Sequence, residues 1–240
     1  MEKSSDKRLI AVEKNYRIVE ERIAEAAQKS GRTREDITFL SAVKTVEPDV
    51  INHVISLGLR YIGENRVQEL LAKYESYDLE HAELQFIGHL QTNKVRYIAD
   101  KVAMIQSVDS VKLASEIARQ SKKIGRTMDI LIEVNIGREE NKSGVMPEML
   151  DELLGQISEI DGVNIKGLMA IPPICEKSAE VCKYFENMHK LFIDISPKKS
   201  DNVSMDILSM GMSDDYYEAI CCGANMVRIG SALFGARVYR

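Results

Sequence analysis

The sequence has few of the features that mark exported, membrane-bound or nucleic-acid-binding proteins. No apolar run approaches the roughly 20 residues that a membrane span needs, and Met1 to Asp6 lack the apolar core of a secretion signal. Lys and Arg number 32 against 37 Asp and Glu, so the charge balance does not indicate a polyanionic partner. We therefore expect a cytoplasmic protein that binds neither nucleic acid nor membrane.

Cysteine and histidine are also sparse, and their spacing supports neither a disulfide framework nor a metal site. The four cysteines form no C-x-x-C pair, and Cys221 and Cys222 are adjacent in a predicted helix, which favours reduced thiols. The four histidines lie far apart, with no H-x-x-x-H or H-E-x-x-H group. We expect no bound metal.

Apolar periodicity predicts one opening helix followed by alternating strands and helices. The opening helix shows apolar residues at spacings of three and four from Leu9 to Ala27, and we expect it to stop at Gly31. Apolar runs that we interpret as strands span residues 37–43, 61–63, 84–88, 102–106, 128–134, 165–169, 205–209 and 226–229. Segments with helical periodicity separate them, at residues 48–57, 66–74, 93–99, 111–124, 147–160, 178–195 and 214–222.

Eight strands separated by helices are typical of a closed parallel barrel. Strands that are apolar on both sides indicate a parallel sheet, and eight repeats are the number that closes a (β/α)₈, or TIM-type, barrel. The alternative is a doubly wound open sheet, but the glycine-rich G-x-G-x-x-G fingerprint after the first strand is missing. We predict one barrel domain over residues 1–240, with an extra N-terminal helix whose residues 1–8 need not be ordered.

Lys44 is the first residue that the barrel prediction singles out. Active sites of such barrels gather at the carboxyl ends of the strands, and Lys44 directly follows the first apolar run. Desolvation there would lower the pKa of its amine and free a neutral nitrogen to attack a carbonyl. The alternative is a strand-end lysine that turns out to solvent, as most lysines do.

A second group of candidates follows the seventh and eighth predicted strands. Ser213 comes after one, and Gly230 and Ser231 come after the other, each at the expected start of a helix. Unpaired backbone N–H groups and the helix dipole favour a phosphate at such a position. Ser213 has an alternative role as a plain helix N-cap followed by Asp214 and Asp215, whose charges would repel a phosphate. Gly230 and Ser231 are therefore the stronger phosphate contacts.

Six ordered motifs resemble the pyridoxal phosphate homeostasis proteins, which are similar to the barrel domain of alanine racemase. The motifs are Lys44-Thr45, YIGENRVQE at 61–69, FIGHLQTNK at 86–94, GLMAIPP at 167–173, LSMGMSDD at 208–215 and VRIGSALFGAR at 227–237. The resemblance runs from about the first strand to the end of the chain. It implies an alanine racemase N-terminal-domain-like fold and pyridoxal 5′-phosphate as cofactor.

The resemblance also implies roles for six residues. Lys44 is implied to form an aldimine with the cofactor aldehyde, and Ser213, Gly230 and Ser231 to contact the phosphate. Arg228 is implied to reach the pyridine nitrogen, where a guanidinium that only donates weakens the ring as an electron sink. The alternative for Arg228 is a structural ion pair inside the barrel. Asn65 is implied to contact the cofactor, with an N-cap before the following helix as its alternative.

Three functions remain open at the level of sequence. In the first, the protein is a monomeric carrier that holds pyridoxal phosphate, contributes to vitamin B6 homeostasis and releases the cofactor to apo-enzymes. The second is an amino-acid racemase, which needs a base on each face of the substrate Cα. In the resembled racemases one base comes from a second domain, and the chain ends at Arg240 soon after the last predicted strand, so we expect negligible racemase activity. The third is a barrel that binds another phosphorylated ligand without covalent chemistry.

Overall fold

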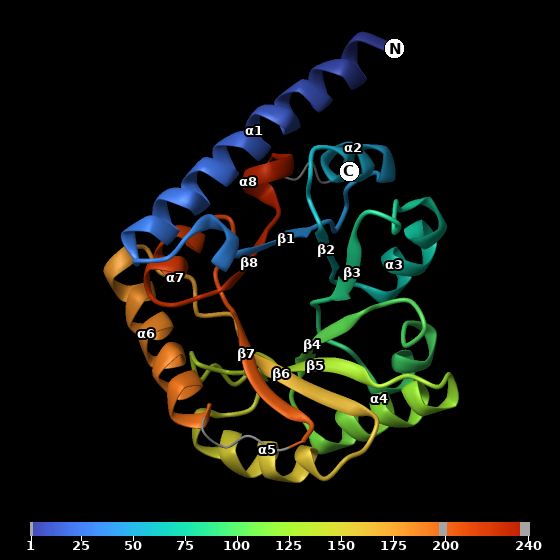
Figure 1. Cartoon of the computed structure of the whole chain (residues 1–240), viewed down its shortest axis with the longest axis vertical. Helices are drawn as coiled ribbons and strands as arrows, with labels where there is room; N and C mark the ends of the chain where they lie inside the picture. The colour runs from blue at the N-terminus through green and yellow to red at the C-terminus, as the bar shows by residue number, and fades with distance from the viewer. Residues whose placement is uncertain (1, 197–200, 236–240) are drawn as a thin grey trace.

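Eight parallel strands form a closed barrel in the order β1-β2-β3-β4-β5-β6-β7-β8, with helices on its outer surface (Figure 1). The computed structural model describes residues 2–196 and 201–235. The strands are β1 (Thr38–Ala42), β2 (Tyr61–Glu64), β3 (Glu83–Phe86), β4 (Met104–Val108), β5 (Met128–Val134), β6 (Val163–Ala170), β7 (Val203–Ser209) and β8 (Met226–Ile229). The (β/α)₈ barrel predicted from the sequence is confirmed.

Most of the helices connect successive strands, and the helices cover the barrel. They are α1 (Glu2–Lys29), α2 (Pro48–Ser56), α3 (Val67–Lys73), α4 (Val111–Lys123), α5 (Leu150–Ser158), α6 (Ser178–Ile195), α7 (Tyr216–Cys221) and α8 (Ser231–Phe234). Short 3₁₀ helices add η1 (Arg34–Asp36), η2 (Tyr74–Ser76), η3 (Thr92–Tyr97) and η4 (Pro147–Met149). In the described part of the chain, every helix lacks the length or the apolar content of a membrane span.

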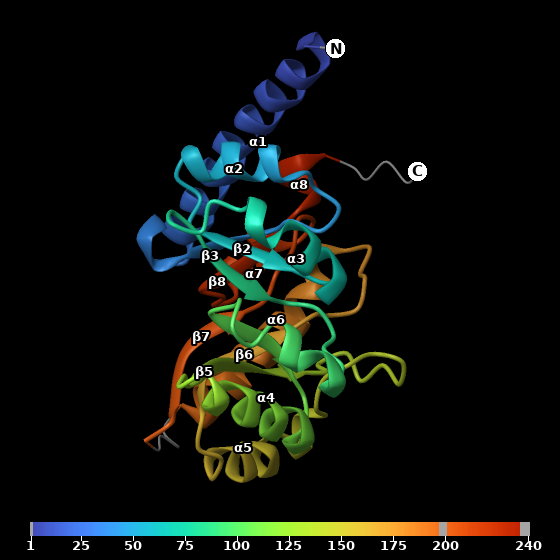
Figure 2. The same cartoon turned by 90° about the vertical axis from the view of Figure 1, so that its right-hand side faces the viewer.

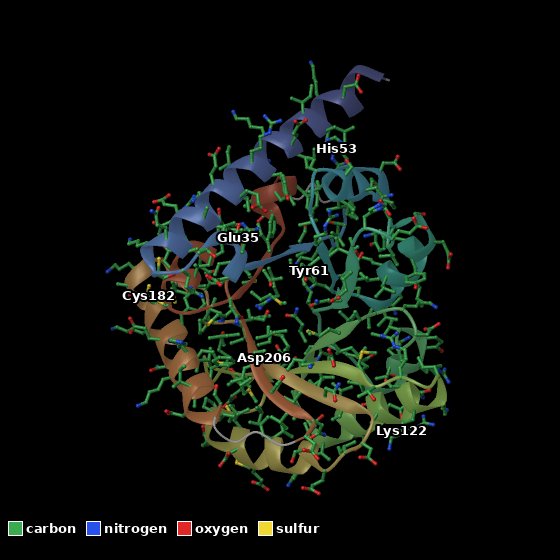
Figure 3. All side chains as sticks on the ribbon, viewed as in Figure 1. Glu35, His53, Tyr61, Lys122, Cys182 and Asp206 are labelled. Carbon is green, nitrogen blue, oxygen red and sulfur yellow. The ribbon has the colours of Figure 1, made fainter. Side chains whose placement is uncertain are left out.

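Alternate residues of each strand face two different environments. Phe39 of β1 and Val227 of β8 belong to the main core between strands and helices. Their neighbours Leu40 and Met226 belong instead to a small cluster with Ile87. Because successive strand side chains point to opposite faces, this small cluster fills the inside of the barrel. Figure 3 shows side chains reaching into the barrel centre, including Tyr61 of β2.

The extra N-terminal helix packs across the place where the barrel closes. Helix α1 lies against α7, α8 and α2, and its N-terminal part projects beyond the barrel (Figure 2). Asn15 Nδ2 donates to the Leu233 carbonyl oxygen at 3.0 Å, and Tyr217 donates from its hydroxyl to Glu25 Oε1 at 2.9 Å. These bonds tie the first helix to the last two helices.

The structure refines the sequence prediction in three places. The segment expected as a helix over 93–99 is the 3₁₀ helix η3, which fits the low α-helix propensity of its Thr, Asn, Val and Tyr residues. Residues 2–8, for which the sequence left order open, belong to α1, while Met1 lies outside the described residues. In the helix expected over 147–160, residues 147–149 form the 3₁₀ helix η4. Elsewhere the ends of strands and helices move by one or two residues.

Gly167 of β6 is the register partner of Ile207 in β7. Its φ is +152°, and a Cβ built there would lie 1.9 Å from the Ile207 carbonyl oxygen. We predict that Gly167→Ala lowers the free energy of unfolding by about 3 kcal/mol, because β7 has to move. Gly155→Ala is the matched control, since Gly155 is exposed on α5 with nothing near its missing Cβ. It should stabilise the protein by about 0.5–1 kcal/mol, and equal urea midpoints for the two variants would contradict the prediction.

Candidate functional site

Lys44 and the Gly230-Ser231 pair lie at the same edge of the barrel because β1 pairs with β8. Ser41 is the register partner of Ile229, so Gly230 comes beside Ala42. A Cβ on Gly230 would lie 3.0 Å from the Ala42 carbonyl oxygen. Lys44 is half-buried and follows Ala42 by two residues. The barrel therefore brings together two candidates from opposite ends of the chain.

Ser213 joins this group through its hydroxyl. Ser213 Oγ accepts from the backbone N–H of Gly230 and from that of Ala232, both at 3.1 Å. The N-cap of the following helix, α7, is Asp215, so Ser213 does not cap that helix as the alternative interpretation proposed. Instead it holds the first turn of α8 from the neighbouring loop. Its own hydroxyl proton has no acceptor among the described residues.

Arg228 lies inside the barrel and is held by neutral partners. The residue is 4% exposed. Its Nη1 donates to Ser209 Oγ at 2.6 Å, and its Nη2 donates to the Ala170 carbonyl oxygen at 2.9 Å. Burial lowers its pKa to about 10, so it remains charged at neutral pH. Among the described residues it makes no ion pair, which argues against the structural ion-pair alternative.

A chain of buried polar side chains fixes the orientation of Arg228. Ser209 donates from Oγ to Gln106 Oε1 at 2.7 Å, and Gln106 donates from Nε2 to Gln85 Oε1 at 2.6 Å. Gln85, Gln106 and Ser209 are each at most 1% exposed. Sequence reasoning missed them, although a glutamine within an apolar strand is a signal that could have marked Gln85 and Gln106.

Asn65 follows β2 at the same edge. The N-cap of α3 is Arg66, so Asn65 is not the N-cap that the alternative interpretation required. Its Oδ1 is buried and accepts no hydrogen bond from the described residues. The backbone there is crowded, since a Cβ on Gly88 would lie 2.0 Å from the Asn65 carbonyl oxygen. At the carboxyl edge of the barrel, Asn65 therefore presents an amide oxygen that has no partner among the described residues.

Glu133 adds a buried acid that the sequence analysis did not single out. It follows Leu131, an interior residue of β5, by two positions and so faces the same side. The side chain is buried, and its Oε2 has no hydrogen-bond partner among the described residues. Burial and then the charge of Asp109 raise its pKa to about 7, against the opposing influence of Arg228.

Two hollows in the described surface lie away from the predicted site residues. One hollow lies beside Lys122, labelled in Figure 3, and another lies beside His189 and Cys222. Neither includes a predicted site residue. Over the part of the chain that the structure describes, His, Cys, Asp and Glu side chains form no group of three that could hold a metal ion, and the four cysteines are free thiols.

Comparisons with known proteins place this barrel in a family. The family model of the alanine racemase N-terminal domain matches residues 38–238. The pyridoxal phosphate homeostasis protein of Aquifex aeolicus is 45% identical over 229 residues, covering 95% of this chain and 99% of that protein. This chain belongs to the pyridoxal phosphate homeostasis protein family.

Solved structures agree with this membership. A crystal structure of an unknown protein from Bifidobacterium adolescentis superposes with a TM-score of 0.90 at 32% identity, covering 95% of this chain and 96% of that chain. PipY of Synechococcus elongatus with pyridoxal phosphate (PLP) bound gives 0.77 at 31% identity, covering 89% of this chain and 100% of that chain. As a member of the homeostasis protein family, this chain thus shares its fold with a solved structure that holds pyridoxal phosphate.

The pKa of Glu133 predicts a pH-dependent stability of this family member. The folded pKa lies above the unfolded value of 4.5, so the stabilisation is complete below about pH 4.5 and is lost as pH rises through about 7. At about 1.36 kcal/mol per pKa unit, the loss approaches roughly 3 kcal/mol. The Glu133→Gln variant cannot titrate at this position, so it should lack this loss. We predict that between pH 5 and 8 the free energy of unfolding falls by roughly 3 kcal/mol more in the unsubstituted protein than in this variant. Urea titrations at each pH measure this, and parallel profiles would contradict it.

Proposed function

We propose that this protein binds pyridoxal 5′-phosphate through Lys44, holds it, and releases it to apo-enzymes, thereby contributing to pyridoxal phosphate homeostasis. The observation that carries the proposal is the convergence of Lys44, Arg228 and the Gly230-Ser231 pair at one edge of the barrel in a member of this family. The cytoplasmic location and the monomeric state expected from the sequence stay predictions.

The groups at this edge fit the proposed ligand. A phosphate needs several N–H and O–H donors, and the hydroxyl of Ser213 lies there against the first turn of α8, which begins with the hydroxyl-bearing Ser231. A substituted aromatic ring with polar edges needs buried hydrogen-bonding groups, and Asn65 Oδ1 and Glu133 Oε2 are buried without partners among the described residues. The donor and acceptor set is therefore matched to a phosphorylated, polar aromatic aldehyde.

Each predicted site residue takes one role in this proposal. Lys44 supplies the amine that links covalently to the aldehyde. Ser213, Gly230 and Ser231 hold the phosphate, with Gly230 allowing close approach because it lacks a side chain. Arg228 faces the ring nitrogen, and Asn65 contacts a polar edge of the ring.

The function that we propose for this protein is that of a carrier and not of an enzyme. Pyridoxal phosphate supplies a reactive aldehyde and, when its ring nitrogen is protonated, an electron sink. The Arg228 guanidinium is a permanent donor, because even its lowered pKa of about 10 is far above neutral pH. A donor at that nitrogen keeps it unprotonated, which weakens the stabilisation of a carbanion and disfavours amino-acid chemistry.

The covalent role of Lys44 is tested by reduction with borohydride. We expect the purified protein with added pyridoxal phosphate to show a visible absorption band, and borohydride to fix the cofactor mass on the peptide that contains Lys44. Lys44→Ala should lose the band and the label, with Lys123→Ala, an exposed lysine on α4, as control. A label on another lysine would overturn the assignment, and the absence of any band would overturn the cofactor proposal.

The carrier proposal predicts negligible turnover of amino acids. Positioned general acid–base groups commonly accelerate proton transfer by about 10²- to 10⁴-fold. We expect none of that gain, so deuterium exchange at Cα of L-alanine in heavy water should match an equal concentration of free pyridoxal phosphate. Mass spectrometry of the alanine measures the exchange. Faster exchange that disappears in Lys44→Ala would support the racemase alternative.

A further inference from the structure

The chain makes a strained turn at Lys44. The Val46 N–H donates to the Val43 carbonyl oxygen at 3.1 Å, which closes a turn with Lys44 and Thr45 at its centre. Thr45 has a φ of +63°, a conformation that turns of this kind reserve for glycine or asparagine at the third position. A β-branched residue is an outlier there. Contacts from outside the turn must therefore hold it.

Two side chains of α3 hold the peptide groups on both sides of Lys44. Lys73 Nζ donates to the Val43 carbonyl oxygen at 3.3 Å. Glu69 Oε2 accepts from the Thr45 N–H at 3.0 Å. Lys73 and Glu69 also lie 3.8 Å apart. Two side chains from one turn of α3 thus form hydrogen bonds with the backbone immediately before and immediately after Lys44.

Lys73 is itself fixed by buried groups. Its Nζ donates to Glu64 Oε1 at 2.9 Å, and the Tyr77 hydroxyl donates to the same oxygen at 2.6 Å. The Glu64 side chain is 0% exposed and that of Lys73 is 16% exposed. Burial and the charge of Glu64 raise the pKa of Tyr77, so its hydroxyl remains a donor. The ammonium therefore has a single well-defined position, unlike that of a surface lysine.

We propose that Lys73 and Glu69 are positioning residues that hold the turn over residues 43–46, and with it the amine of Lys44, in place for covalent capture of the cofactor aldehyde. This inference rests on the proposed function of Lys44. Neither residue has to touch the ligand, because both act through the backbone. If they served stability alone, their loss would lower the unfolding temperature without changing capture by the folded protein.

The first test compares Glu69→Ala with Glu69→Gln. The affinity for pyridoxal phosphate is read from the absorption band, and circular dichroism checks that each variant is folded at the assay temperature. We expect Glu69→Ala to weaken binding about tenfold, the effect of losing one hydrogen bond to a charged group. Glu69→Gln should stay within about threefold, because its amide oxygen still accepts from Thr45. Removing a negative charge should by itself strengthen binding of an anion, so weakening identifies the positioning role.

A second variant removes Lys73 without leaving a buried charge unpaired. Lys73→Met combined with Glu64→Gln should also weaken binding about tenfold while the protein stays folded. Lys123→Met, at an exposed position of α4, is the matched lysine control and should bind as the unsubstituted protein does.

Thr45→Gly supplies an independent measurement. Glycine adopts a positive φ without strain, so the turn no longer depends on Glu69. In that background Glu69→Ala should change the affinity by less than about threefold, a coupling expected of residues in direct contact. If Glu69→Ala and the Lys73 variant fold and bind like the unsubstituted protein, or if Thr45→Gly leaves the Glu69 effect unchanged, the inference is wrong. Failure of the unsubstituted protein to capture the cofactor at Lys44 would instead overturn the proposed function.

Discussion

Parallel pairing between β1 and β8 closes the barrel, and the candidate site depends on this contact. Thr38 to Ser41 run in register with Met226 to Ile229, which sets the loop after β8 against the loop that carries Lys44. An open sheet with the same elements would leave these two loops at opposite edges. Helix α1 packs across the same seam through α7 and α8, so the extra N-terminal helix covers the closure from outside.

The interior of the barrel combines an apolar filling with a polar chain. Leu40, Ile87 and Met226 pack together inside, while Gln85, Gln106, Ser209 and Arg228 form a hydrogen-bonded chain beside them. Burying a guanidinium is costly unless its donors are paired, and here Ser209 and the Ala170 carbonyl group pair two of its nitrogens. The polar chain thus lets a charged group stay inside the barrel in one orientation.

The alanine racemase type of barrel is a scaffold, and a scaffold alone does not decide an activity. The particular groups at the carboxyl edge carry the chemical argument for this protein. Arg228 is a permanent donor, Glu133 is a buried acid with a raised pKa, and Lys44 sits in a turn that α3 holds from both sides. The proposed carrier role rests on these groups.

The sequence alone determined the order of elements and the residues that follow each strand. Hydrophobic period and length are local properties, and they identified eight strands and placed Lys44, Asn65, Ser213 and Gly230 at strand ends. They could not decide what these residues contact. In strands that are buried on both sides, periodicity does not tell the barrel interior from the helix-facing side, so Gln106 and Glu133 went unrecognised.

Only the tertiary structure decided the partners. Ser213 meets the N–H groups of Gly230 and Ala232 rather than its own helix, Asn65 is not an N-cap, and Lys73 reaches back to Val43. The contacts of Ser213 and Lys73 each join separate elements of the chain. Closing the barrel fixes which strand ends become neighbours, and that is a property of the whole sheet that no single segment of the sequence contains.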